Sequence, residues 1–236
     1  MHHTGSAALD KCRWRNTLRY SALHRTSPLK YRLAIFDVDG TLADSFPWFA
    51  KVLNGVADEF GFRRVTADEV EALRGCDAQE ILRRLEVPRF RLPMIARHMR
   101  ALKTRHLDEI ALFAGVGGML RQLAEAGLVL AVVSSDSEAN VRGTLGAQNQ
   151  KLIAHYACGA SLFGKRAKFS AVLRRTRVEP KRTIAIGDEL RDAEAARQVG
   201  IAFGAVSWGY TGIAALRAAA PEEIFSSVEE IAAKLA

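Results

Sequence analysis

Four short apolar runs, each closed by a polar turn, constrain the fold of this chain more than any other feature. The runs are Tyr31–Phe36, Leu128–Val133, Thr183–Ile186 and Ile201–Val206. A continuous apolar run of this length is typical of a strand that is buried on both faces. Strands of that kind belong to parallel sheets, in which helices cover both sides.

Segments with helical periodicity alternate with these runs. Val116–Ala126 is followed by Gly127 and Arg191–Val199 by Gly200, and glycine commonly ends a helix. Phe169–Thr176 places its apolar residues on one helical face. The alternation of strands and helices predicts an α/β fold with a Rossmann-like parallel sheet.

The stretch that follows the first run has a different character. From Ser45 to about Phe113 it contains no convincing strand, and its apolar residues recur at helical spacing. Pro88 and Pro93 divide it into several helices. We therefore predict a small helical cap over residues 45–114, inserted after the first strand into a core of residues 29–44 and 115–236.

The positive charge of the chain is concentrated before the predicted core. The formal net charge is +8, and residues 1–30 hold six basic residues and one acidic residue, which is +5 of that total. A nucleic-acid-binding domain needs a basic face on folded structure, so this distribution argues against a nucleic-acid partner. Residues 1–28 lack periodicity, and we predict a disordered leader there. Their arginine-rich composition leaves an organellar transit peptide as an alternative.

Two features bear on the compartment of the protein. No apolar run approaches the roughly 18 residues of a membrane-spanning helix, which predicts a protein without a membrane partner. The three cysteines, Cys12, Cys76 and Cys158, are widely spaced and odd in number. That pattern argues against a disulfide framework and fits the reducing cytosol. We therefore predict a cytoplasmic protein, either a monomer or a homodimer.

Polar side chains follow three of the four predicted strands. Asp37 and Asp39 follow the first strand, Ser134 the second, and Asp188 and Asp192 the third. Ligands of open parallel sheets bind at the carboxyl ends of the strands, so these groups are expected to converge there. Converging carboxylates repel one another unless a cation lies between them. Oxygen ligands favour Mg²⁺, so the four aspartates predict a magnesium site.

Other side chains near these strand ends suit a phosphate. Mg²⁺ commonly recruits a phosphorylated substrate, and the Ser134 hydroxyl could hold a phosphate oxygen. Lys165 in the loop before the third strand and Lys168 at a helix start compete for the role of phosphate-binding lysine. An aspartate beside such a site could attack phosphorus and form an aspartyl-phosphate.

These motifs resemble the four signatures of the haloacid dehalogenase-like hydrolase superfamily, in the expected order. Asp37-Val38-Asp39-Gly40-Thr41-Leu42 is similar to the first signature and Val132-Val133-Ser134 to the second. Gly164-Lys165 matches the third, and Gly187-Asp188-Glu189-Leu190-Arg191-Asp192 the fourth. The predicted cap is similar to the small cap of phosphoglycolate phosphatase-like members.

The resemblance implies a role for each aspartate. Asp37 would be the nucleophile and also a Mg²⁺ ligand. Asp39 would protonate the leaving alcohol and then activate water, and its backbone carbonyl would bind the metal. Asp188 would bind Mg²⁺ directly, with Asp192 orienting it or binding through water.

The resemblance also implies roles for the phosphate-binding residues. Thr41 would position Asp39 beside the phosphate, Ser134 would hydrogen-bond a phosphate oxygen, and Lys165 would offset negative charge. The family spacing favours Lys165 over Lys168. Arg74 in the cap is a candidate substrate contact.

Together these features predict a Mg²⁺-dependent phosphatase that acts on a small phosphorylated metabolite, and phosphoglycolate is the leading substrate by resemblance. Asp39 argues against a dehalogenase, because a departing halide needs no proton. A phosphomutase similar to β-phosphoglucomutase shares the same core and stays an alternative. From a different class, a phosphoacceptor signalling domain also combines aspartate, serine, lysine and Mg²⁺.

Overall fold

A six-stranded parallel sheet lies at the centre of the molecule. The structure is a computed structural model that describes residues 29–76, 78–159 and 164–236, so the predicted leader lies outside the described residues. The strand order is β3-β2-β1-β4-β5-β6, which confirms the predicted Rossmann-like sheet. The strands are β1 (Leu33–Phe36), β2 (Val129–Val133), β3 (His155–Ala157), β4 (Thr183–Gly187), β5 (Ala202–Val206) and β6 (Glu223–Phe225).

Strand β1 is the most deeply buried part of this sheet. It pairs with β2 on one side and β4 on the other, and Phe36 lies opposite Val132 and Ile186. All four residues of β1 have no solvent exposure. An uninterrupted apolar run is required here because side chains on both faces pack against helices.

Helices cover both faces of the sheet. Ala34 and Phe36 pack in a core with α5 (Val116–Glu125), α6 (Glu138–Asn149) and α10 (Val228–Leu235). Leu33 and Ile35 point to the other face, against α7 (Lys165–Thr176), α8 (Leu190–Val199) and α9 (Ile213–Ala218). Alternate residues of β1 thus contribute to two separate cores, one on each face of the sheet.

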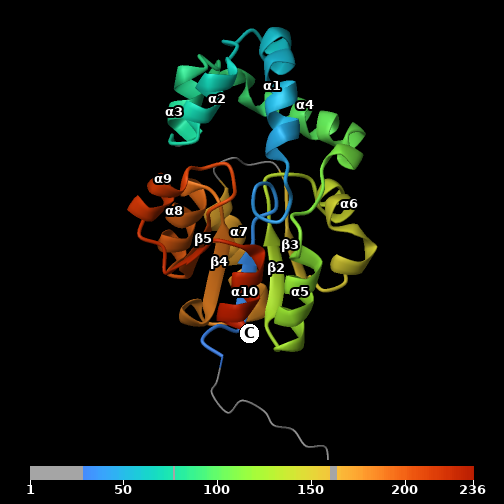
Figure 1. Cartoon of the computed structure of the whole chain (residues 1–236), viewed down its shortest axis with the longest axis vertical. Coiled ribbons are helices and arrows are strands. Elements are labelled where there is room, and N and C mark those ends of the chain that lie inside the picture. The colour runs from blue at the N-terminus through green and yellow to red at the C-terminus, as the bar shows by residue number, and fades with distance from the viewer. Residues whose placement is uncertain (1–28, 77, 160–163) are drawn as a thin grey trace, which may run out of the picture.

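Four helices between β1 and β2 form the helical insertion that we call the cap. They are α1 (Phe46–Phe60), α2 (Ala67–Leu73), α3 (Ala78–Arg84) and α4 (Leu92–Arg105). Proline lies in the first turn of α1 and of α4, where a missing N–H costs no hydrogen bond. A capping box between Thr66 and Glu69 begins α2. Figure 1 shows these helices as a separate group at one end of the sheet.

Some of the secondary structure was not predicted. β3 and β6 have three residues each and lie at the two edges of the sheet. Short 3₁₀ helices also occur at η1 (Arg89–Arg91), η2 (Leu107–Glu109) and η3 (Pro180–Arg182). Within the described ranges, no helix combines the length and apolar character that crossing a membrane requires.

Candidate active site

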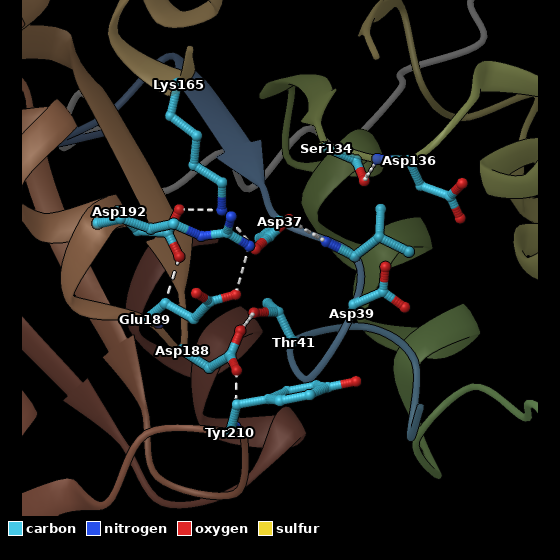
Figure 2. Close-up of polar contacts among 12 residues, drawn as sticks. Asp37, Asp39, Thr41, Ser134, Asp136, Lys165, Asp188, Glu189, Asp192 and Tyr210 are labelled. Atoms are coloured by element: carbon cyan, nitrogen blue, oxygen red, sulfur yellow. Dashed lines mark hydrogen bonds and ion pairs between the residues drawn. The ribbon is translucent and has the colours of Figure 1, made fainter. Parts of the chain in front are cut away.

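Three buried aspartates meet at the carboxyl ends of β1 and β4 (Figure 2). One carboxylate oxygen from each of Asp37, Asp188 and Asp192 lies within 4.8 Å of the other two. The Asp37 N–H donates to the carbonyl of Ile186 at 2.9 Å, which continues the β1–β4 pairing beyond the strand. The parallel register therefore brings the first and fourth motifs together.

The turn after β1 leaves room for Asp188 only because it contains glycine. Gly40 has a φ of 76°, and a Cβ at this position would lie 2.2 Å from Asp188 Oδ2. Thr41, the next residue, donates its hydroxyl hydrogen to Asp188 Oδ1 at 2.8 Å. The Thr41 hydroxyl thus contacts Asp188, and the predicted role of Thr41 in positioning Asp39 stays a prediction.

Asp188 is held by hydrogen bonds and not by a cationic side chain. Besides the Thr41 hydroxyl, the Tyr210 N–H donates to Asp188 Oδ2 at 2.7 Å. No lysine or arginine in the described part of the chain forms an ion pair with Asp188. Complete burial, and then the charges of Glu189 and Asp37, raise the pKa of Asp188 well above its usual value. A bound cation would favour the ionised form of this carboxyl.

Lys165 lies between the other two aspartates of the cluster. Its Nζ donates to Asp37 Oδ2 at 2.5 Å and also contacts Asp192 Oδ1. Burial raises the pKa of Asp192 to about 7, against the opposing effect of Lys165. Burial acts to lower the pKa of Lys165, but the charges of Asp192 and Asp37 outweigh it and raise that pKa. Lys165 is the first residue of α7, so its predicted place in a loop is wrong.

The donor set of this cluster fits Mg²⁺. Asp37, Asp188 and Asp192 supply only carboxylate oxygens, which are the ligands that Mg²⁺ prefers. Burial disfavours the ionised form of two of these carboxyls, and a bound divalent cation would reverse that effect. Asp192 is fixed in the first turn of α8, where it accepts the Glu189 N–H at 3.2 Å.

Asp39 points away from this cluster and contacts the cap. Lys103 of α4 places its Nζ 2.6 Å from Asp39 Oδ1 and 2.9 Å from Asp136 Oδ2. Lys103 is only 5% exposed although it carries a charge. Sequence reasoning missed both Lys103 and Asp136. Lys103 follows Met99 by four residues, so its place on the apolar face of α4 was the available signal.

Ser134 and Lys168, two of the candidate phosphate-binding residues, lie around the end of β2. Ser134 directly follows β2, is buried, and its Oγ accepts the Asp136 N–H at 3.0 Å. Lys168 donates to the carbonyls of Ser134 and Gly159 at 2.5 and 2.7 Å. Lys168 thus holds the loops after β2 and β3, whereas Lys165 contacts the carboxylates.

Arg74 connects the cap to the loop of residues 207–211. Its guanidinium donates to the carbonyls of Gly209 at 2.5 Å and Tyr210 at 3.1 Å. It also lies 5.1 Å from the ring centroid of Phe46. Trp208 in the same loop donates its Nε1–H to the Thr41 carbonyl at 3.2 Å. The loop therefore lies beside the site.

Gly209 gives a direct test of how this loop supports Asp188. A Cβ at Gly209 would lie 2.1 Å from Asp188 Cβ, so Gly209→Ala is expected to displace the Asp188 side chain. We expect Mg²⁺ affinity, measured by isothermal titration calorimetry, to fall about tenfold or more. Gly118→Ala is the matched control, since a Cβ there meets no atom within 4 Å. Wild-type affinity in folded Gly209→Ala protein would contradict a role of Asp188 in binding the metal.

Comparisons with known proteins agree with this geometry. The family model described as haloacid dehalogenase-like hydrolase matches residues 34–206. A phosphoglycolate phosphatase of Synechococcus elongatus is 31% identical over 198 residues, which cover 84% of this chain and 93% of that protein.

Solved structures show the same fold. A haloacid dehalogenase-like family hydrolase from Streptococcus pneumoniae superposes with a TM-score of 0.72 at 20% identity, covering 86% of this chain and 98% of that one. CbbY from Rhodobacter sphaeroides, solved in complex with phosphate, gives a TM-score of 0.64 at 25% identity, with 87% and 99% covered.

Proposed function

This chain belongs to the haloacid dehalogenase-like hydrolase family, and we propose that it is a Mg²⁺-dependent phosphatase that hydrolyses a small phosphate monoester through an aspartyl-phosphate. The observation that carries the proposal is the contact of Lys165 with Asp37 inside a cluster of three buried carboxylates. The similarity to phosphoglycolate phosphatases makes phosphoglycolate the first substrate to test.

Asp37 is the proposed nucleophile. Its Oδ1 accepts the Val38 N–H at 2.8 Å and its Oδ2 accepts the Lys165 ammonium, so the carboxylate has one fixed orientation. A carboxylate oxygen attacks phosphorus, the bond from phosphorus to the ester oxygen breaks, and an aspartyl-phosphate forms. Mg²⁺ bound by Asp37, Asp188, Asp192 and the Asp39 carbonyl would supply positive charge at the transferring phosphoryl group.

Asp39 is the proposed general acid and base. In the first step it gives a proton to the departing alcohol oxygen, and in the second it takes a proton from the water that attacks the aspartyl-phosphate. Lys103 fixes the Asp39 carboxyl at the boundary between the cap and the core. The proton therefore moves on the side of the site that faces the substrate's organic group.

Ser134 and Lys165 are the proposed phosphate-binding residues, and Thr41 acts beside them by orienting Asp188. The contacts support Lys165 over Lys168 for this role, because Lys168 is bonded to two backbone carbonyls. The proposal includes a cytoplasmic location, a monomer or homodimer, and a small phosphorylated metabolite as the partner.

The phosphatase is tested by release of inorganic phosphate from phosphoglycolate and from an aryl phosphate, with Mg²⁺ and with excess chelator. We expect activity to fall at least about 100-fold in chelator and to return when Mg²⁺ is restored. Full activity in excess chelator would contradict the role of the metal. With a sugar phosphate as the substrate, an isomerised sugar phosphate in place of free phosphate would identify a phosphomutase. An aspartyl-phosphate that persists for minutes without turnover would identify a signalling phosphoacceptor.

A further inference from the structure

A large cavity opens over the proposed nucleophile and extends into the cap. Its volume is about 580 Å³, and side chains of α1, α2, α3 and α4 line it together with Asp37 and Asp39. We propose that this cavity binds an apolar organic group, so that the preferred substrates are aryl or medium-chain alkyl phosphate monoesters. The inference rests on the proposed phosphatase function and assigns its substrate class.

Most polar residues that line the cavity lie on its floor, and Arg74, Arg100 and Lys103 of the cap also line it. Asp37, Asp39, Ser135, Asp136 and Arg191 line the cavity from the core side. These groups lie at the carboxyl ends of β1, β2 and β4, around the place where the phosphoryl group would be transferred. The floor is therefore the phosphate end of the cavity.

Most of the side chains with which the cap lines the roof of the cavity are apolar. The cap contributes Phe49 and Val56 from α1, Val70 from α2, Ile81 from α3, and Ile95 and Met99 from α4. A charged or strongly polar group placed against these side chains would lose its hydration without gaining a partner. An aliphatic or aromatic group would instead remove their apolar surface from water.

Most of the cationic groups that the cap offers to the cavity are already engaged. Lys103 pairs with Asp39 and Asp136, and Arg74 is bonded to two backbone carbonyls and to Glu71. Arg100 also lines the cavity, and no described residue accepts a hydrogen bond from its guanidinium. An acidic organic group of the substrate would thus depend on Arg100 for its counterion. Arg100 lies one turn before Lys103 in α4.

The volume of the cavity also favours a substrate with a large organic group. Cavities of about 300–1,000 Å³ suit ligands far larger than a phosphate with a two-carbon acid. Burial of each additional methylene is worth about a fourfold increase in kcat/KM when the group leaves water completely. A chain of six carbons is thus expected to be preferred over one of two carbons by about 250-fold.

The test compares kcat/KM for ethyl phosphate, hexyl phosphate, 1-naphthyl phosphate and phosphoglycolate. We expect hexyl phosphate to exceed ethyl phosphate by about 250-fold, and naphthyl phosphate also to exceed it. Ala96→Trp, which fills the cavity from α4, is expected to lower the hexyl-to-ethyl ratio at least about tenfold. Ala101→Trp is the matched control, because Ala101 lies exposed on the same helix outside the cavity and should keep the wild-type ratio.

Two results would overturn the inference. Equal kcat/KM for hexyl and ethyl phosphate, with phosphoglycolate preferred, would refute the apolar substrate class but not the phosphatase activity. If Arg100→Met then loses the preference for phosphoglycolate, the cavity binds an acidic organic group. If no ester is hydrolysed, the proposed function fails, and calorimetric binding of hexylphosphonate against methylphosphonate then decides the cavity. Equal affinities for the two phosphonates would overturn the inference, and tighter binding of hexylphosphonate would support it.

Discussion

Asp37→Asn is expected to lower phosphate release by about four orders of magnitude or more. An amide at this position cannot form the acyl-phosphate bond, so the residual rate would come from direct attack by water. The substitution preserves shape, and the amide oxygen can still accept the Val38 N–H, so the fold is expected to persist. Phosphate release under saturating Mg²⁺ measures the effect, and acid-quenched reactions with labelled substrate should show phosphoenzyme in the wild type alone.

Asp58→Asn is the control for the loss of one carboxylate charge. Asp58 lies exposed on the cap and pairs with Arg64 at 2.9 Å, and it contacts none of the described residues of the proposed active site. Its activity should stay close to that of the wild type. Near-normal turnover or a stable label in Asp37→Asn protein would refute Asp37 as the nucleophile.

Lys165→Met is expected to damage both stability and activity. The substitution leaves Asp37 and Asp192 buried without their shared ammonium, and breaking a buried ion pair costs about 3–5 kcal/mol of unfolding free energy. Activity should fall about 100-fold or more, because the ammonium also stabilises charge on the transferring phosphoryl group.

The loss of stability should depend on pH in a defined direction. A buried carboxyl whose pKa is raised takes up its proton as the pH falls, and the neutral form no longer needs Lys165. The stability deficit of Lys165→Met, measured by thermal unfolding in chelator, should therefore be larger at about pH 8 than at about pH 5. A deficit that shrinks as the pH rises would contradict this account.

Lys168→Met is the matched control for this lysine. Lys168 is on the same helix and donates to backbone carbonyls, so its loss should reduce activity much less than loss of Lys165. A larger loss of activity in Lys168→Met would assign the phosphate to Lys168.

The strands that carry the site could be predicted from sequence because they are buried on both faces. β1, β2 and β4 are uninterrupted apolar runs in the sequence. Once the sheet is predicted to be parallel, the polar residues that follow these strands are expected at the same edge of it. β3 was missed because His155–Ala157 is short and half-buried, so it leaves no such run. An edge strand pairs with only one other strand, so its amino-acid composition is less constrained.

The contacts that the sequence did not reveal join residues far apart along the chain. The Thr41 hydroxyl could have served either of two aspartates, and only the parallel pairing of β1 with β4 brings it to Asp188. Lys103 and Asp39 are 64 residues apart, and their pairing depends on the position of α4 over the sheet. No local pattern encodes that position, since it results from packing of the whole cap.

The placement of Lys103 would make an opening of the cap depend on ionic strength. Swinging α4 away from the sheet would remove the counterion of Asp39 and Asp136 together, so the closed arrangement is electrostatically favoured while the site is empty. Thr104 and Asn140 add a hydrogen bond of 2.7 Å beside that pair. Added salt screens the separated charges and lowers the free-energy difference between closed and open forms. Substrate entry and product departure should accordingly become faster as the salt concentration rises.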